Sequence, residues 1–330
     1  PPPDAAFDAL APTYDDDFTE TIIGHHLRER VHRRLDILFS AGDALLELGC
    51  GTGEDALYLA QRGVHITVTD ASSSMLTVAR EKLALTGTRV VMLDIGHLPG
   101  HPGDPRVFPA RSGKPGFSGD QPDDLTGPAG KFTQIQGDSG ALSGEPGLLP
   151  GRPSRKDDFP DAPGDAFGLS GPFDGVLANF GVLNVVSNYI SIARWLAARV
   201  RPSGTLAFAV MAPNCLWELA WHALNGDFTT ATRRWHTSTT FHETPGQPIE
   251  IYYPSPSQLA RQFAPYFERT ALVPLGLWLP PSDVYPMIER RPKLLKWLTY
   301  ADDNFGANAI TARFADHYWI ELQRTDAPAP

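Results

Sequence analysis

The sequence contains little that would support a disulfide scaffold, a membrane span or a nucleic-acid-binding surface. Only two of its 330 residues are cysteines, Cys50 and Cys215, which excludes a disulfide framework and a multi-cysteine zinc site. No apolar run approaches the roughly 18 residues of a transmembrane helix, and the first residues lack the pattern of a secretory signal. Lysine and arginine total 28 against 38 acidic residues, and the net charge of −10 disfavours a nucleic-acid partner. We expect a soluble cytoplasmic protein without stable membrane insertion, and leave its oligomeric state open.

Glycine and proline are unevenly distributed along the chain. Residues 97–172 hold 15 of the 30 glycines and 13 of the 31 prolines, and they show no sustained helical or alternating period. Such a composition cannot bury enough apolar area to offset its ordering entropy. We expect an inserted, disordered surface segment. A structured lid is the alternative, because loops of this length are either functional or disordered.

Outside this insert, the hydrophobic pattern predicts strands that alternate with helices. Apolar positions at helical spacing mark residues 17–40 as a helix that precedes the first strand. The predicted strands are residues 44–48, 64–69, 89–93, 173–178, 204–211 and 318–323, and the further helices are residues 55–62, 72–85 and 190–200. This alternation predicts an α/β fold, in which a mostly parallel sheet carries helices on both faces.

Aromatic residues concentrate in the second half of the chain. All seven tryptophans lie between Trp195 and Trp319, in a stretch that proline also punctuates. We expect an α+β aromatic cap over the sheet, although any single tryptophan is as readily explained by the cap's own core. The predicted organisation is an N-terminal helical cover at 1–43, a core at 44–211 interrupted by the insert at 97–172, a substrate cap at 212–300, and a final core strand with a tail at 301–330.

A glycine-rich turn follows the first predicted strand. The segment ELGCGTG places glycines at 49, 51 and 53, directly before a predicted helix. Glycines there let a ligand approach the backbone, and the helix start offers unpaired N–H groups. The spacing differs from the G-x-G-x-x-G of dinucleotide folds, and Glu54 and Asp55 would repel a pyrophosphate. Glu47, just before the turn, suits a cationic or amine-bearing ligand.

Acidic residues also end the second and third predicted strands. Asp70 follows Gly53 by 17 residues, and its carboxylate can accept both hydroxyls of an adenosine ribose. Asp94 ends the third strand and can accept from an adenine amino group. Together with Glu47, these strand ends describe a nucleoside pocket without a phosphate site.

At this point the sequence resembles the class I S-adenosylmethionine (SAM)-dependent methyltransferases, in their small-molecule branch. The segments that carry the resemblance occur in the family's order: 47–60, 65–76, 90–96, 173–184 and 201–211. The resemblance implies a Rossmann-like, doubly wound, mostly parallel seven-stranded sheet whose last strand is antiparallel. It also implies transfer of a methyl group from SAM, which leaves S-adenosylhomocysteine (SAH).

The resemblance also assigns roles to single residues. The implied cofactor contacts are Gly49, Gly51 and Gly53 along the methionine part, Glu47 at its amino end, Asp70 at the ribose hydroxyls, Ala71 and Met75 beside the adenine, Asp94 and Ile95 at the adenine edge, Asn179 and Phe180 on the route to the methyl group, and Tyr14 in a segment that closes over the cofactor. A strand-like piece inside the insert ends at Asp138, which is the alternative adenine reader to Asp94.

The sequence commits to no catalytic base and to no metal site. Glu218 and His222 lie four residues apart on one helical face, so His222 is a weak nomination for a base, with an ordinary surface pair favoured. Cys215 is expected to be a small buried hydrophobe. The basic run at residues 25–34 is expected to be a solvated helix face.

The expected function is an enzyme that transfers a methyl group from SAM to a small, lipophilic or aromatic acceptor (class EC 2.1.1.-). The aromatic and aliphatic content of the cap favours such an acceptor. One alternative is an NAD-dependent oxidoreductase, which would need a glycine at position 54, where the chain has Glu54. The other is a non-catalytic protein that binds SAM or SAH on a degenerate methyltransferase fold.

Overall fold

The computed structural model describes residues 5–98, 168–169, 171–241, 248–306 and 308–328. All of them belong to the unit formed by residues 1–107 and 161–330. Nearly all of the predicted insert, and Asp138 with it, lies outside the described residues.

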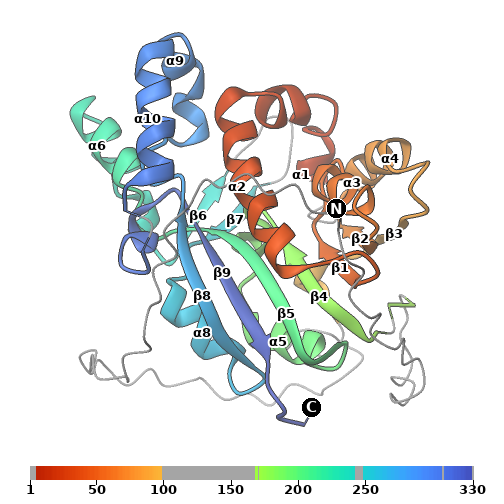
Figure 1. The fold of residues 1–330 in the computed structure, drawn as a ribbon. Coiled ribbons are helices and arrows are strands. Elements are labelled where there is room, and N and C mark those ends of the chain that lie inside the picture. Colours follow the sequence, from red (N-terminus) through yellow and green to blue (C-terminus); the bar gives the residue numbers. More distant parts are fainter. Residues whose placement is uncertain (1–4, 99–167, 170, 242–247, 307, 329–330) are drawn as a thin grey trace, which may run out of the picture. The chain divides into compact units, whose positions relative to one another are not determined.

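Seven strands form one sheet in the order β3-β2-β1-β4-β5-β9-β8 (Figure 1). They are β1 (Ala44–Leu48), β2 (His65–Asp70), β3 (Arg89–Met92), β4 (Phe173–Ala178), β5 (Val200–Met211), β8 (Phe267–Leu275) and β9 (His317–Arg324). The pairs from β3 to β5 are parallel, whereas β9 runs antiparallel to both of its neighbours. The mostly parallel seven-stranded sheet with one antiparallel strand is therefore confirmed.

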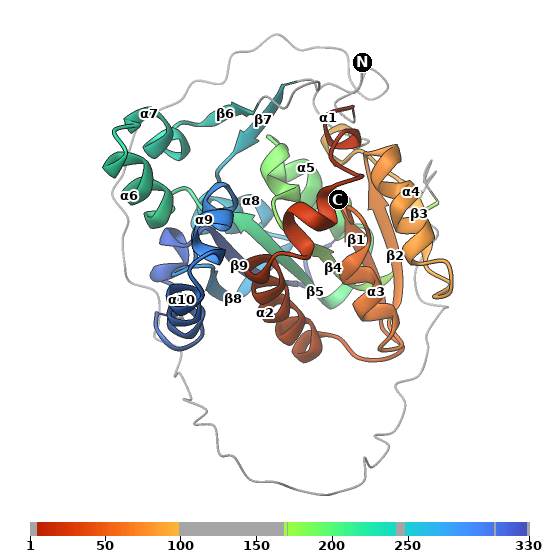
Figure 2. The same cartoon turned by 90° about the horizontal axis from the view of Figure 1, so that it is seen from above.

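Helices cover both faces of this sheet, as predicted (Figure 2). One core packs around α2 (Ile22–Leu38), α3 (Glu54–Ala60), α4 (Ser73–Lys82), α9 (Tyr285–Glu289) and α10 (Pro292–Asn304). The other packs around α5 (Tyr189–Ala197) and α8 (Pro256–Phe263). The central strands are buried on both sides, so β1 and β4 read as nearly continuous apolar runs.

The remaining elements lie at one end of the sheet. They include α6 (Leu216–Leu224), α7 (Phe228–Ala231), the short helix η4 (Arg233–Trp235), and a separate hairpin of β6 (Ser238–Phe241) and β7 (Ile249–Tyr252). The N-terminal segment adds α1 (Ala5–Asp8) and the short π-helix η1 (Asp15–Thr19), and single-turn helices η2 (Ile95–His97), η3 (Val182–Val185), η5 (Ser282–Val284) and η6 (Thr311–Phe314) complete the list. None of the helices in the described part of the chain is long and apolar enough to cross a membrane.

One part of the predicted cap belongs to the core sheet instead. Strand β8 falls inside the range 212–300, yet it pairs with β9 along its whole length, and α8 packs on the same sheet. The sequence obscures this strand because its first half carries the exposed residues Glu268, Arg269 and Thr270. Pro274, which still pairs in register with Tyr318, also disfavours a strand in the sequence pattern. The other domain limits stay predictions.

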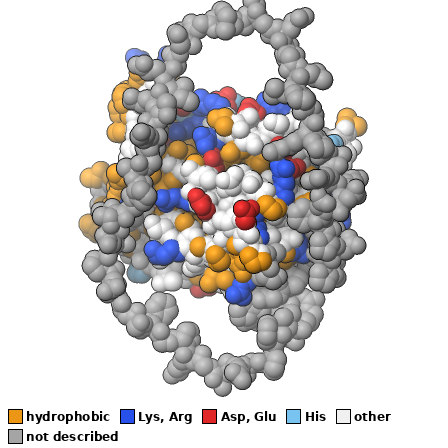
Figure 3. Space-filling view, turned by 60° about the horizontal axis from the view of Figure 1, so that its bottom comes forward, with side chains coloured by type: hydrophobic (Ala, Val, Ile, Leu, Met, Phe, Trp, Pro, Cys, Tyr) orange, Lys and Arg blue, Asp and Glu red, His pale blue; other side chains and the backbone are white. Residues whose placement is uncertain are grey.

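The carboxyl ends of the parallel strands lie at one edge of the sheet, together with the turn after β1. The opposite edge, seen in Figure 3, carries basic and acidic side chains mixed with apolar ones. Ligands of open α/β sheets bind at the carboxyl edge, which is therefore where the site is expected.

Candidate functional site

The turn after β1 is held in a conformation that requires glycine. Gly49, Gly51 and Gly53 all have φ between +52° and +84°, in the left-handed region. A Cβ on Gly49 would lie 2.5 Å from Val182, and one on Gly53 would lie 3.2 Å from Leu83, so these two glycines allow close packing. Gly51 differs, because a Cβ there would meet only the ring of Tyr14, at 3.9 Å. The backbone is therefore open to a ligand at Gly51.

Asp70, at the end of β2, fixes the shape of this turn. Its two carboxylate oxygens accept from the backbone N–H groups of Gly51 and Ser72, each at 2.9 Å. Burial raises the pKa of Asp70, partly offset by these hydrogen bonds. The predicted ribose ligand and the glycine turn are thus part of one arrangement.

Glu47, the last residue but one of β1, is a buried carboxylate with spare acceptor capacity. It is 2% exposed, and its Oε2 has no hydrogen-bond partner among the described residues. Burial, with the nearby charges of Asp55 and Asp70, raises the pKa of Glu47 well above its usual value. A buried acceptor without a partner is costly, so this oxygen fits a donor supplied by a ligand.

A buried ion pair lies beside Glu47 that sequence reasoning missed. Arg28 of α2 is 8% exposed, and its Nη1 lies 2.8 Å from the Asp55 carboxylate of α3. Asp55 also lies 2.8 Å from His32 Nε2 and accepts from Asn179 Nδ2 at 2.7 Å. Burial alone would raise the pKa of Asp55, but Arg28 and His32 hold it well below its ordinary value. The Nε of Arg28 is buried and without a partner among the described residues.

The prediction of a solvated basic face on α2 is therefore wrong. Besides Arg28 and His32, Arg30 pairs with Asp302 and Arg34 with Glu321, both in the C-terminal part of the chain. Charge runs are usually solvated, but α2 packs against buried carboxylates that lie far away in the sequence. No local pattern announces those partners.

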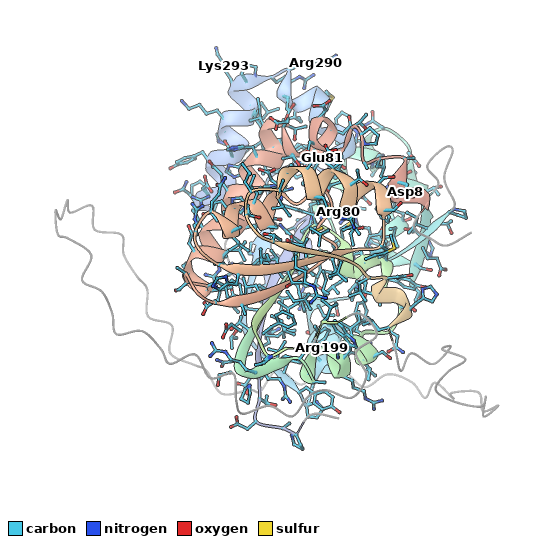
Figure 4. All side chains as sticks on the ribbon, turned by 90° about the vertical axis from the view of Figure 1, so that its right-hand side faces the viewer. Asp8, Arg80, Glu81, Arg199, Arg290 and Lys293 are labelled. Carbon is cyan, nitrogen blue, oxygen red and sulfur yellow. The ribbon has the colours of Figure 1, made fainter. Side chains whose placement is uncertain are left out.

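The N-terminal segment is anchored directly over the glycine turn. Asp15 accepts from Thr52 Oγ1 at 2.7 Å and from Lys82 Nζ at 2.9 Å. Asp8 accepts from the hydroxyl and the backbone at the start of α4, beside which Figure 4 shows it. These anchors place the Tyr14 ring above Gly51, where the sequence predicted a residue that covers the cofactor.

Asn179 and Phe180 follow β4 at the same edge of the sheet. Asn179 is buried against Asp55, and Phe180 has a φ of 48°, which is strained for a bulky residue. The Phe180 ring packs edge-on against Phe18 at 4.8 Å and lies 5.1 Å from the Arg28 guanidinium. The structure thus brings both residues to the glycine turn, through Asp55 and Arg28.

The residues predicted to contact adenine line the next part of the edge. Met75 and Ile95 are buried, and Ala71 is half-buried directly after Asp70. Asp94 caps the short helix η2, where it accepts from the backbone of Gly96 at 2.8 Å and lies 2.5 Å from His97 Nδ1. Their role toward adenine stays a prediction.

In the cap, the carboxylate of Glu218 serves an ion-pair network. It accepts from Arg233 at 2.8 Å and from Arg234 at 3.0 Å, and it is 1% exposed. His222 Nδ1 lies 3.9 Å from Asp227. Glu218 is thus neither a surface residue nor free to act as a base with His222, whose nomination stays a prediction.

Cys215 directly precedes the same helix and lines a cavity of about 140 Å³ with Arg234 and Trp235. It is buried, and burial raises the pKa of its thiol to about 12. These observations agree with its interpretation as a small buried hydrophobe.

Comparison with known proteins identifies the family. A model of the methyltransferase domain matches residues 22–266, nearly three quarters of the chain. The chain belongs to the class I SAM-dependent methyltransferase family. A chain from the solved complex between the Haloferax volcanii Trm112 methyltransferase activator and a methyltransferase has the same fold, with a TM-score of 0.50 and 13% identity over 100% of this chain and 98% of that one.

Two curated methyltransferases are similar over a shorter segment. The demethylmenaquinone methyltransferase of Clavibacter sepedonicus is 35% identical over 80 residues, which are 24% of this chain and 33% of that protein. Methyltransferase GfsG of Streptomyces halstedii is 36% identical over 81 residues, which are 23% of this chain and 28% of that protein. The match spans a third or less of either relative.

Proposed function

We propose that this protein transfers a methyl group from SAM to a small, lipophilic acceptor. The observation that carries the proposal is the set of unmet hydrogen-bonding groups around the glycine turn. Glu47 Oε2 and Arg28 Nε are buried and lack partners among the described residues, and the backbone beside them is open at Gly51. A buried acceptor and a buried donor without partners match the ammonium and carboxylate of a bound amino acid.

The residues present fit the whole cofactor. Glu47 would hold its ammonium group, and Arg28 would hold its carboxylate. Asp70 has lone pairs to spare beyond its two backbone bonds, and these would accept the ribose hydroxyls. In the same arrangement Ala71, Met75, Asp94 and Ile95 would enclose the adenine.

The residues of the chain would contribute to catalysis by positioning the two reactants and by enclosing them away from water. When bound, SAM supplies an electrophilic methyl group on a positively charged sulfur. Phe180 and Asn179 would border the path from the cap to that methyl group, and the Tyr14 segment would exclude water above Gly51. Holding the two reactants close and aligned accounts for most of the rate enhancement of such a displacement.

The proposed class of acceptor is inferred from the side chains of the cap. Its helices expose large apolar side chains such as Leu224, Phe228 and Trp235, which suit a lipophilic molecule. The name of one relative, a demethylmenaquinone methyltransferase, agrees with an aromatic acceptor.

Isothermal titration calorimetry with SAH and with NAD tests the proposal. We expect micromolar binding of SAH and no heat from NAD. Binding of NAD alone would favour the oxidoreductase, and the absence of any binding would contradict the proposal. Incubation with methyl-labelled SAM and a panel of phenols then separates an enzyme, which yields organic-extractable label, from a protein that only binds SAM.

A further inference from the structure

His317 lies at the carboxyl edge of the sheet, on the side of the cap. It is the first residue of β9, and its register partners are Met211 at the end of β5 and Leu275 at the end of β8. Its ring packs edge-on against the ring of Phe180, with the centroids 6.0 Å apart. His317 therefore borders the path that the proposed function assigns to the reacting groups.

A fixed carboxylate stands behind this imidazole. His317 Nδ1 lies 3.0 Å from Asp316 Oδ2, in an ion-pair contact whose angle is too poor for a hydrogen bond. Both side chains are nearly buried, at 12% and 7% exposure. The other ring nitrogen, Nε2, has no hydrogen-bond partner in the described part of the chain, and it is not among the buried atoms. This leaves Nε2 open to a ligand.

Asp316 is itself held from three directions. Its Oδ1 accepts from Arg234 Nη2 at 2.6 Å, and its backbone carbonyl accepts from Arg234 Nη1 at 2.9 Å and from Ala212 N at 3.0 Å. Its backbone N–H donates to Gly276. Burial alone would raise the pKa of Asp316, but the charges of His317 and Arg234 lower it below its ordinary value. Asp316 therefore keeps its negative charge beside the imidazole.

We propose that His317 is the general base of the methyl transfer and that Asp316 positions it; the inference rests on the proposed function. The neutral imidazole would take the proton of an acceptor O–H at Nε2, while an oxygen lone pair forms the bond to the methyl carbon. The carbon–sulfur bond breaks with its electron pair left on sulfur, and the imidazolium then gives its proton to water. The arrangement follows the orienting role of a carboxylate behind a catalytic histidine.

Charged groups lie on the elements packed against His317. Asp316 pairs with Arg234 from η4, which in turn pairs with Glu218 from α6. Arg28 of α2 lies on the Phe180 ring that His317 contacts. A general base must be neutral to accept a proton, so turnover should rise as the pH is raised from acidic values.

The test compares the full chain with His317→Gln, Asp316→Asn and His236→Gln. The last variant is the control, because His236 is an exposed histidine of the cap. Three readouts are SAH binding by calorimetry, NMR titration of the His317 imidazole with SAH bound, and methyl transfer to 1-naphthol between about pH 6 and 9.

We expect all four proteins to bind SAH equally. In His317→Gln, kcat should fall by ~100-fold or more with little change in KM, and the rise with pH should vanish. In Asp316→Asn, the NMR midpoint of His317 should move to lower pH, because the carboxylate no longer favours the charged ring. His236→Gln should match the wild type in every readout.

Normal SAH binding with an unchanged kcat in His317→Gln would overturn the inference and leave the proposed function intact. If 1-naphthol is not methylated by the wild type, the NMR readout decides. The inference is overturned if the His317 imidazole stays charged between about pH 6 and 9. It is also overturned if Asp316→Asn leaves the midpoint of the NMR titration of His317 unchanged. Absence of SAH binding in the wild type would instead contradict the proposed function itself.

Discussion

The two halves of the carboxyl edge differ in which parts of the chain form them. Over β1 and β2 the backbone that is open to a ligand belongs to the glycine turn at residues 49–53, which is contiguous in sequence. Over β5 and β9 lies a network of side chains from three separate segments, formed by Glu218, Arg234, Asp316 and His317. The first half can therefore be recognised in the sequence as a motif, whereas the second half can be recognised only in the folded structure.

The largest effect is expected where the backbone itself must stay open. Gly51→Arg places a long side chain in the space below Tyr14, so SAH binding should be lost beyond detection by calorimetry, with the circular dichroism spectrum unchanged. Gly87→Arg is the matched control, because Gly87 also has positive φ (+72°) and open space around its Cβ. If both variants lose SAH equally, strain rather than ligand space explains the result.

A large loss of stability is expected at the base of the glycine turn. Asp55→Ala leaves Arg28 buried without its carboxylate and should lower the free energy of unfolding by ~3–5 kcal/mol in urea titrations. Asp303→Ala breaks the exposed pair with Arg33 and should cost ~0–1 kcal/mol.

The loss of stability in Asp55→Ala should depend on pH in one direction only. Because the pKa of Asp55 is lowered by folding, its contribution is present above the ordinary carboxyl pKa and is lost as the pH falls toward the folded value. The difference in the free energy of unfolding between wild type and Asp55→Ala should therefore become smaller as the pH is lowered. A gap that widens would contradict the assigned ion pair.

In the cap, removal of a buried carboxylate should leave cofactor binding unchanged. Glu218→Gln removes the carboxylate that Arg233 and Arg234 share, and we expect ~1.5–3 kcal/mol of lost stability in thermal or urea unfolding. SAH affinity should stay unchanged. Asp227→Asn keeps the N-cap of α7 and should be neutral. A parallel fall in SAH affinity for Glu218→Gln would show that the two halves of the edge are coupled.

The smallest effect, and the most specific, concerns a single proton. The pKa of Glu47 is raised by burial, and a bound ammonium group would lower it, so SAM binding should release a proton and strengthen as the pH rises to that pKa. Calorimetry in two buffers of different ionisation enthalpy measures the release. Glu47→Gln should abolish it and weaken binding by roughly tenfold, whereas Glu54→Gln should do neither. Proton uptake by the wild type would contradict the role of Glu47.

The sequence predicted the sheet because its central strands are buried on both faces. Strands β1 and β4 were located to the residue, since apolar runs between turn signals leave no other element that fits. Edge strand β8 was missed because its exposed face carries charge and its core face is short. Periodicity thus identified every parallel strand, including the edge strand β3, and missed the antiparallel edge strand β8.

The candidate site divides in the same way. Gly51 and Asp70 were predicted because the glycine turn directly follows the first predicted strand and Asp70 ends the second. Arg28 was assigned to solvent, since its partner Asp55 lies 27 positions away on another helix. His317 gave no signal at all, because it becomes a candidate only beside Phe180 and Asp316.

The most direct test of the central claim is a crystal structure of the full chain with SAH. We predict the ammonium group within hydrogen-bonding distance of Glu47, the carboxylate at Arg28 and the ribose hydroxyls at Asp70, with Tyr14 above. SAH bound away from the turn at residues 49–53, or bound there with Glu47 and Arg28 still unpartnered, would contradict the claim that these buried groups are built for the cofactor.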